Sequence, residues 1–168
     1  MTLAEINAMD EAAFVRALGG VFEHSPWVAR RAFAARPFAD LASLHVAMVD
    51  AMGRADDDEK LALLRAHPEL AGKAAVRGEL TADSTKEQSG AGLAHCTPEE
   101  FATITALNRR YNEKFGFPFI LAVKGYDRAG ILREFARRVE RDRATELAEC
   151  LAQVARITRF RLEALVAP

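Results

Sequence analysis

The sequence Arg-Ala-His-Pro-Glu-Leu-Ala-Gly-Lys occupies residues 65–73, and Ser-Thr-Lys-Glu-Gln-Ser-Gly-Ala-Gly-Leu occupies residues 84–93. A helix should end at the first stretch, because Pro68 disfavours the α conformation for His67. The second stretch begins with a Ser-x-x-Glu spacing that is typical of a helix start. The polar connection between them should hold at most one turn of helix, and loops of that length commonly have a function. We expect the two helix ends to form the polar floor of a small-molecule site.

On both sides of these motifs, apolar residues recur every three to four positions, which indicates amphipathic helices. Glycine and proline are sparse, at 10 and 6 residues, so long helices are not interrupted. A chain of 168 residues also suits one core, since single domains commonly have about 100 to 200 residues. We therefore predict an all-α fold, a single-domain bundle of about seven to nine helices over residues 1–168. Besides the helix that begins at Ser84, the expected helices cover approximately residues 3–6, 10–18, 26–36, 41–53, 58–66, 97–115, 127–143 and 144–166.

One apolar segment does not fit this helical pattern. Residues 117–125 read Phe-Pro-Phe-Ile-Leu-Ala-Val-Lys-Gly, a composition that suits a β-strand. A strand needs a partner, and the rest of the chain offers none. We therefore predict an extended turn that passes into a short helix.

Composition excludes several classes of partner. The net charge is −1 and charged residues make up 28% of the chain, so no nucleic-acid partner is expected. No apolar run approaches the roughly 18 residues of a membrane helix. Cys96 and Cys150 are expected to be free thiols, because they lack close spacing and no secretory leader is evident. The chain ends in Leu-Val-Ala-Pro, which is not a peroxisomal tripeptide, and a cytoplasmic location is expected.

Metal and phosphate chemistry are not predicted either. His95 and Cys96 are adjacent, and no set of His, Cys and carboxylate residues has the spacing of metal ligands. The sequence contains neither a glycine-rich phosphate loop nor a nucleophile elbow. We therefore expect no metal site.

Four side chains have the chemistry of a site. His67 is an imidazole at a helix end, and imidazole is the usual proton carrier near neutral pH. Glu87 and its neighbour Gln88 offer a carboxylate and an amide that can bind a polar ring. Arg161 falls in the middle of the apolar stripe of the last helix, where a guanidinium must reach water or meet an anion. That stripe comprises Leu147, Leu151, Val154, Thr158 and Leu165.

His67, Glu87 and Arg161 also have purely structural interpretations. His67 can cap the C-terminus of its helix against the helix dipole. Ser84 and Glu87 have the spacing of a capping box. Arg161 can pair with a carboxylate of the core. The acidic run at residues 56–59 is interpreted as a solvated helix start.

Four blocks of the sequence resemble one family. His-Pro-Glu-Leu at 67–70, the stretch at 84–93, Asn-Arg-Arg-Tyr-Asn-Glu-Lys-Phe-Gly-Phe-Pro-Phe-Ile-Leu-Ala-Val-Lys-Gly at 108–125 and Arg-Leu at 161–162 resemble the signature of OHCU decarboxylases. The resemblance covers essentially the whole chain, in order. It implies an all-helical, cofactor-free lyase, commonly a homodimer. Such enzymes convert 2-oxo-4-hydroxy-4-carboxy-5-ureidoimidazoline (OHCU) to (S)-allantoin in urate breakdown.

The resemblance also assigns roles to individual residues. It implies that His67 is the proton donor and that Glu87 takes part in catalysis. Arg161 matches the arginine of the family's last helix. The residues that it implies line the substrate are Pro68, Ser84, Thr85, Lys86, Glu87, Gln88, Phe119, Ile120, Leu121, Ala122 and Val123.

Two other functions stay open at this point. In the first, the protein is a helical module that binds a purine breakdown product without changing it. In the second, it is a structural interaction protein in which every polar motif is a helix cap. Stereospecific turnover distinguishes the enzyme from both.

Overall fold

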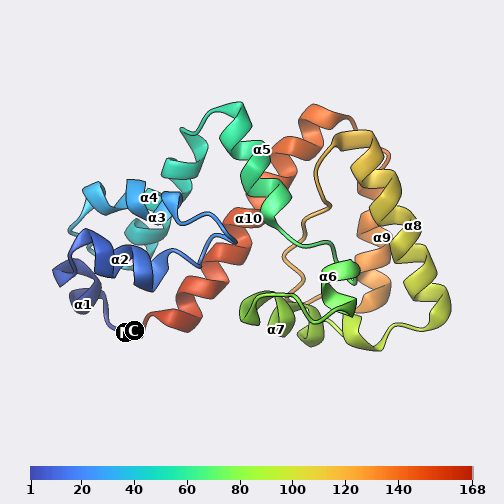
Figure 1. The fold of residues 1–168 in the computed structure, drawn as a ribbon, viewed down its shortest axis with the longest axis horizontal. Helices are drawn as coiled ribbons and strands as arrows, with labels where there is room; N and C mark the ends of the chain where they lie inside the picture. Colours follow the sequence, from blue (N-terminus) through green and yellow to red (C-terminus); the bar gives the residue numbers. More distant parts are fainter. Residues whose placement is uncertain (168) are drawn as a thin grey trace. The chain divides into compact units, whose positions relative to one another are not determined.

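The computed structural model describes residues 1–167, and these residues form α-helices and two short 3-10 helices without any strand. The all-α prediction is confirmed. No helix in this part of the chain is long and apolar enough to cross a membrane. The helices, labelled in Figure 1, are α1 (Leu3–Ala8), α2 (Glu11–Leu18), α3 (Trp27–Ala32), η1 (Phe33–Ala35), α4 (Leu41–Gly53), α5 (Asp57–Ala66), α6 (Lys73–Val76), α7 (Ala82–Gly90), η2 (Leu93–His95), α8 (Pro98–Phe115), α9 (Arg128–Arg138) and α10 (Arg143–Leu165).

The helices belong to two compact units. Unit 1 comprises residues 1–66 together with the C-terminal residues from Val154 onward, and unit 2 comprises residues 67–153. Helix α10 contributes its first half to unit 2 and its second half to unit 1. The expectation of one domain over the whole chain stays a prediction.

The helix starts of unit 1 follow local sequence signals. Asp10, Asp40 and Asp56 each accept a hydrogen bond from the backbone N–H three residues further on, at 2.7 to 2.8 Å. Such caps satisfy N–H groups that the first turn of a helix leaves without an intrahelical partner. Helices α2 and α4 therefore begin where the sequence predicts them, and the acidic run at 56–59 is a helix start.

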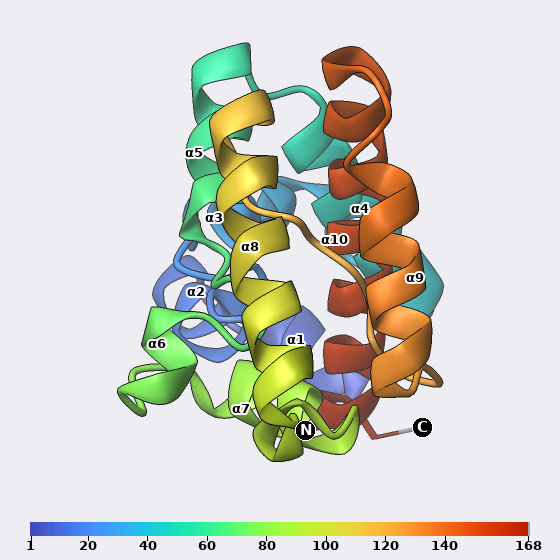
Figure 2. The ribbon, with the colours of Figure 1, turned by 90° about the vertical axis from the view of Figure 1, so that its right-hand side faces the viewer.

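The core of unit 2 is built around one tyrosine. Tyr111 on α8 is fully buried, and its ring lies 4.5 Å from that of Phe115 and 5.9 Å from that of Phe135 on α9, measured between centroids. Phe119 stacks on Phe135 with 3.9 Å between the ring centroids. These contacts pack α8 against α9, and both figures show the two helices side by side (Figures 1 and 2).

A buried ion pair lies in the same core. Arg138 on α9 and Glu146 on α10 are both fully buried, with 2.8 Å between Nε and Oε1. The Tyr111 hydroxyl donates to the same carboxylate oxygen at 2.6 Å. Burial raises the pKa of Tyr111, so its hydroxyl stays protonated and remains a donor. Both charges are therefore compensated inside the core, as burial of charge requires.

Two details of the predicted fold were wrong. The turn predicted at residues 117–125 is present, with residues 118–123 buried and without regular secondary structure, but the short helix predicted after it is absent before α9. On α10, Val154, Thr158 and Arg161 are buried as predicted, but Leu147 and Leu151 are only half-buried and Leu165 is 40% exposed. Leu165 lies beside the buried face of the helix, which continues from Thr158 through Leu162 to Val166.

The buried pair predicts a large stability difference between two Glu→Ala variants. Glu146→Ala should lower the free energy of unfolding by about 3 to 5 kcal/mol, because it leaves the Arg138 charge buried without its carboxylate. Glu140 also contacts an arginine, Arg110, but in solvent, so Glu140→Ala should change stability much less. Urea unfolding of both variants measures the two effects. Equal losses would contradict the predicted contribution of the buried pair.

Candidate functional site

His67 lies directly after α5, which ends at Ala66. Its side chain is 7% exposed, and its Nε2 atom is shielded from solvent. Pro68 follows and ends the helix, as the sequence predicts. The imidazole is therefore buried at the start of a turn rather than displayed on the surface.

The turn that follows His67 has a constrained backbone. Ala71 has a φ of +47°, which is unusual for a residue with a side chain and costs free energy. Glu69 folds back over Gly72, where a Cβ would lie 2.7 Å from the Glu69 Cβ atom. Only glycine fits such a close approach. This turn therefore needs support from other parts of unit 2.

That support comes from amide side chains on two helices. Gln88 on α7 accepts a hydrogen bond from the Ala71 N–H at 2.9 Å and donates to the Glu69 carbonyl at 3.3 Å. Asn108 on α8 donates to the Leu70 carbonyl at 2.9 Å. The backbone of residues 69–71 is thus bonded to both α7 and α8. The first, second and third blocks of the sequence signature meet at this turn.

Helix α7 starts one turn earlier than predicted. Its N-cap is Thr81, whose hydroxyl accepts from the Ser84 N–H at 3.2 Å, and the helix begins at Ala82. The capping box predicted at Ser84 and Glu87 is therefore wrong, and Ser84 is a buried residue inside the first turn. The N–H groups that the first turn leaves without an intrahelical partner therefore follow Thr81, whereas the sequence predicted that they follow Ser84.

The five predicted substrate-lining residues of α7 differ in exposure. Ser84 and Gln88 are buried, and Glu87 is half-buried. Thr85 and Lys86 are exposed. Gln88 uses one N–H and one oxygen lone pair on the turn at 69–71, although an amide has two of each. Its main observed role is therefore to hold the turn.

The predicted segment Phe119–Val123 is buried throughout and has no regular secondary structure. Its backbone is bonded to side chains instead of to a second strand. The Ala122 N–H donates to Gln153 of α10 at 2.9 Å, and the Ile120 carbonyl accepts from Arg138 of α9 at 2.7 Å. In Figure 2 the segment runs between α8 and α9. The helices around it therefore fix the path of its backbone.

Arg161 is on α10 in the part that belongs to unit 1. Its side chain is 5% exposed, and its Nη1 atom lies 2.7 Å from Oε2 of Glu23, which is also buried. The same nitrogen donates to the Val21 carbonyl at 3.4 Å. The structural interpretation of Arg161, a pair with a core carboxylate, is therefore confirmed. Its role toward substrate stays a prediction.

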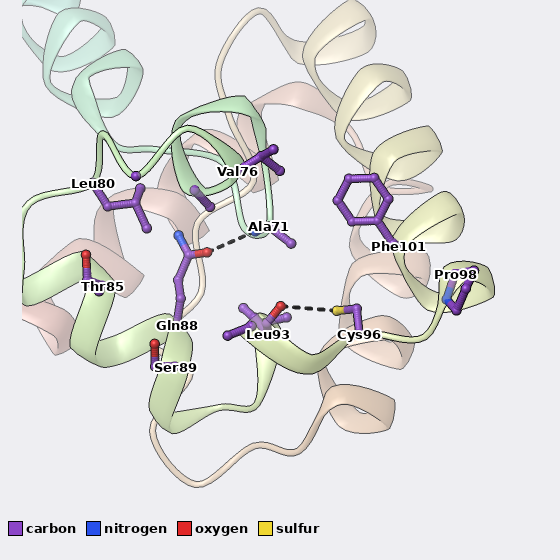
Figure 3. A pocket seen from close by; sticks show the side chains of 13 residues that line it. Ala71, Val76, Leu80, Thr85, Gln88, Ser89, Leu93, Cys96, Pro98 and Phe101 are labelled. Carbon is purple, nitrogen blue, oxygen red and sulfur yellow. Dashed lines mark hydrogen bonds between the residues drawn. The ribbon is translucent and has the colours of Figure 1, made fainter.

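A pocket of about 560 Å³ lies within unit 2 and is lined by α6, α7, η2 and the start of α8. Figure 3 shows Gln88 and Thr85 on one side and Phe101 and Cys96 on the other. Two of the predicted substrate-lining residues, Thr85 and Gln88, therefore contribute to it. Burial, followed by the charge of Glu100, raises the pKa of the Cys96 thiol. Cys96 is thus protonated at neutral pH and is a poor nucleophile.

Among residues 1–167, no group of three His, Cys, Asp or Glu side chains could hold a metal ion. Cys96 and Cys150 are both free thiols, as predicted. The expectation that no cofactor is needed stays a prediction.

Sequence reasoning missed the residues that support the site. Asn108, Asn112, Arg138 and Gln153 bond the turn and the extended segment, yet none was singled out. Arg138 follows Ile131 and Phe135 at helical spacing, so the sequence places a charged residue on the buried face of α9. A buried partner for Arg138 could have been predicted from this pattern. The asparagines lie inside a signature block, but their partners become evident only in the folded chain.

Comparison with known proteins identifies the relatives of the chain. Residues 7–163 match the family model described as OHCU decarboxylase. The chain is 39% identical over 168 residues to the 2-oxo-4-hydroxy-4-carboxy-5-ureidoimidazoline decarboxylase of Halalkalicoccus jeotgali, covering 100% of this chain and 93% of that protein. It is also 39% identical over 165 residues to the uric acid degradation bifunctional protein PucL of Bacillus subtilis, covering 98% of this chain. The chain spans only 33% of that bifunctional protein.

Two solved structures have the same fold. The crystal structure of (S)-allantoin synthase has a TM-score of 0.77 and 27% sequence identity, and the match covers 99% of this chain and 54% of that chain. The crystal structure of OHCU decarboxylase in the presence of (S)-allantoin has a TM-score of 0.69 and covers 94% of this chain and 98% of that chain. Its identity is 20%, so this second likeness concerns the fold alone.

The close approach of Glu69 to Gly72 predicts the effect of a single methyl group. Gly72→Ala should lower the free energy of unfolding by about 1 to 3 kcal/mol, because the new Cβ overlaps with Glu69 and forces the turn to move. Gly90→Ala is the control, since a Cβ there meets nothing within 4 Å. Urea unfolding should show little or no loss for the control. A Gly72→Ala variant as stable as the wild type would contradict the described turn.

Proposed function

This chain belongs to the OHCU decarboxylase family, and we propose that it removes CO₂ from OHCU to give (S)-allantoin in urate degradation. The family is one of carboxy-lyases, and a relative named for this activity is 39% identical over 93% of its own length. The structural observation that carries the proposal is the turn at residues 69–71, where three signature blocks meet beside a buried His67.

The substrate itself supplies much of the chemistry. Loss of CO₂ leaves an electron pair on a ring carbon next to a C=N bond, and that bond accepts the pair. The nitrogen of that bond takes up a proton. Allantoin forms when the hydroxyl oxygen has lost its proton and the neighbouring ring carbon has gained one. The protein must therefore orient the ring and direct the proton, which are tasks that side chains can perform.

His67 is proposed as the proton donor. It assists loss of CO₂ by accepting the proton of the hydroxyl group and then gives that proton to one face of the neighbouring ring carbon, so that one enantiomer forms. Its burial supports this role, because a proton donor shielded from bulk water does not compete with solvent protons arriving at the other face. The rigid turn after His67 supports it further, since a fixed imidazole reaches only one face.

Glu87 is proposed to accept hydrogen bonds from the N–H groups of the ring and of the ureido group. It is half-buried on α7, where a carboxylate interacts more strongly with a polar ligand than in open solvent. Pro68, Ser84, Thr85, Lys86 and Gln88 are proposed to line the substrate beside it. Because Gln88 already holds the turn, we assign it the remaining N–H and lone pair of its amide.

The segment Phe119–Val123 is proposed to form another wall of the site. Its path is fixed by Arg138 and Gln153, so it is a rigid surface. Arg161 is proposed to stabilise negative charge that develops on the substrate, the role that its position in the family signature implies. Its pair with Glu23 fixes the guanidinium in place.

We also propose that the protein is a cytoplasmic homodimer, as the family resemblance implies. Light scattering on the purified protein should give a mass near twice the 18.4 kDa of one chain. A mass of one chain at all working concentrations would contradict the dimer.

Two variants test the proposed site. His67→Ala and Glu87→Ala should fold normally and lose most of the turnover, because the proton donor or the ring-binding carboxylate is missing. Circular dichroism of the product formed from freshly generated OHCU measures both rate and stereochemistry. With either variant, the slow spontaneous decay to racemic allantoin should continue.

Asp83→Ala is the matched control, because Asp83 is an exposed carboxylate on the same helix to which no contact with substrate is assigned, so its loss should leave the rate close to that of the wild type. A near wild-type rate in both His67→Ala and Glu87→Ala would refute the site. A wild-type protein that binds allantoin but leaves the racemic rate unaltered would instead favour a binding module.

A further inference from the structure

We propose that Asn108 and Asn112 of α8 are positioning residues for the reaction, because they hold the turn that fixes the His67 imidazole. The inference rests on the proposed function, in which His67 is the proton donor. Neither asparagine is assigned a direct contact with substrate. They act through the backbone and side chain of the residues that follow His67.

Asn112 bonds to the side chain of this turn. Its Nδ2 atom donates to Oε1 of Glu69 at 2.5 Å and to the carbonyl of Asn108 at 3.1 Å, which uses both N–H groups of the amide. The Glu69 carbonyl accepts from Gln88 on the other side. Glu69 is thus held from α7 and from α8 at once.

Asn108 bonds to the backbone of the same turn. It is 3% exposed and donates from Nδ2 to the Leu70 carbonyl at 2.9 Å. A buried carbonyl outside a helix needs such a partner. The next residue, Ala71, has a positive φ, a strained conformation that persists only where neighbouring groups enforce it. Asn108 is therefore one of the groups that enforce it.

The supporting helix is itself rigid. Asn108, Tyr111, Asn112 and Phe115 follow each other at the spacing of one helix face. Tyr111 and Phe115 are anchored in the aromatic core, and the Tyr111 hydroxyl is bonded to the buried Glu146. The two amides thus connect the turn to a helix that is anchored in the core of unit 2.

The link from this turn to catalysis is short. Glu69 is two residues from His67, and Pro68 between them has a fixed φ that transmits a backbone shift. Misplacement of a catalytic group by about 1 Å can cost roughly 100-fold in rate. Loss of the support should therefore lower kcat much more than substrate affinity.

The test exchanges donor and acceptor across the bond between residues 69 and 112. In Asn112→Asp, two carboxylates face each other and repel, so kcat should fall by about 10- to 100-fold while KM changes by less than about threefold. In Glu69→Gln, the Asn112 amide can still donate to the new amide oxygen, so kcat should stay within about threefold of the wild type.

The double variant is the decisive one. In Glu69→Gln with Asn112→Asp, the amide of residue 69 can donate to the carboxylate of residue 112, so the bond forms again with reversed polarity. The kcat of the double variant should therefore rise well above that of Asn112→Asp, although residue 112 no longer donates to the Asn108 carbonyl. If Asn112→Asp does not fold, Asn112→Ala removes the donor without adding charge and should show the same fall in kcat. Asn108→Ala should show that fall too, since the Leu70 carbonyl loses its donor.

Asn7→Asp in unit 1 is the matched control. Asn7 donates from its amide to the Phe38 carbonyl at 2.9 Å, so the same substitution also replaces a bonded amide N–H by an oxygen atom. It should lower Tm and leave kcat unchanged. An Asn112→Asp variant that behaves in the same way, or a double variant without recovery, would overturn the positioning role.

A second readout separates this inference from the proposed function. NMR titration of the His67 imidazole, identified by its loss in His67→Gln, should give a different curve in Asn112→Asp and the wild-type curve in the double variant. Absence of wild-type turnover would refute the proposed function, whereas the titration would still decide the positioning role. Identical titration curves in all three proteins would overturn the inference.

Discussion

Buried backbone N–H and C=O groups outside a helix need partners, and this constraint shapes both irregular segments of the proposed site. The turn at residues 69–71 is bonded to Gln88 and Asn108, and the extended segment at 118–123 is bonded to Arg138 and Gln153. All four side chains are on helices. The helices of unit 2 therefore give a defined shape to two stretches of chain that have no regular structure of their own. The sequence motifs of the proposed site therefore hold these two stretches in place, in addition to supplying the groups proposed for the reaction.

Local sequence signals predicted most of the helices, because a cap or a helix end depends on a few neighbouring residues. The caps at Asp10, Asp40 and Thr97 are of this kind. The same local rule failed at α7, where Thr81 and Ser84 are both possible caps and burial of Ser84 decides between them. It failed again at residues 118–123, where the backbone is bonded to side chains distant in the sequence. No local pattern contains that information.

The site was predicted to a different extent for each residue. His67 and Glu87 carry a recognisable pattern, and the pattern placed them at helices α5 and α7. Asn108 looks like any polar residue of a helix until the chain folds and the Leu70 carbonyl faces it. Arg161 could be a ligand clamp or part of a core ion pair, and Glu23 at 2.7 Å shows the ion pair. A charge on an apolar stripe reveals that a partner exists but not which one.

We propose that the buried imidazole of His67, fixed by the turn at residues 69–71, directs a proton to one face of the substrate. The substrate itself supplies the C=N bond that accepts the electron pair. The most direct measurement is the circular dichroism of allantoin formed from freshly generated OHCU at several concentrations of wild-type protein. We predict that (S)-allantoin accumulates at a rate proportional to the protein concentration. Racemic allantoin forming at the spontaneous rate, whatever the protein concentration, would contradict the claim.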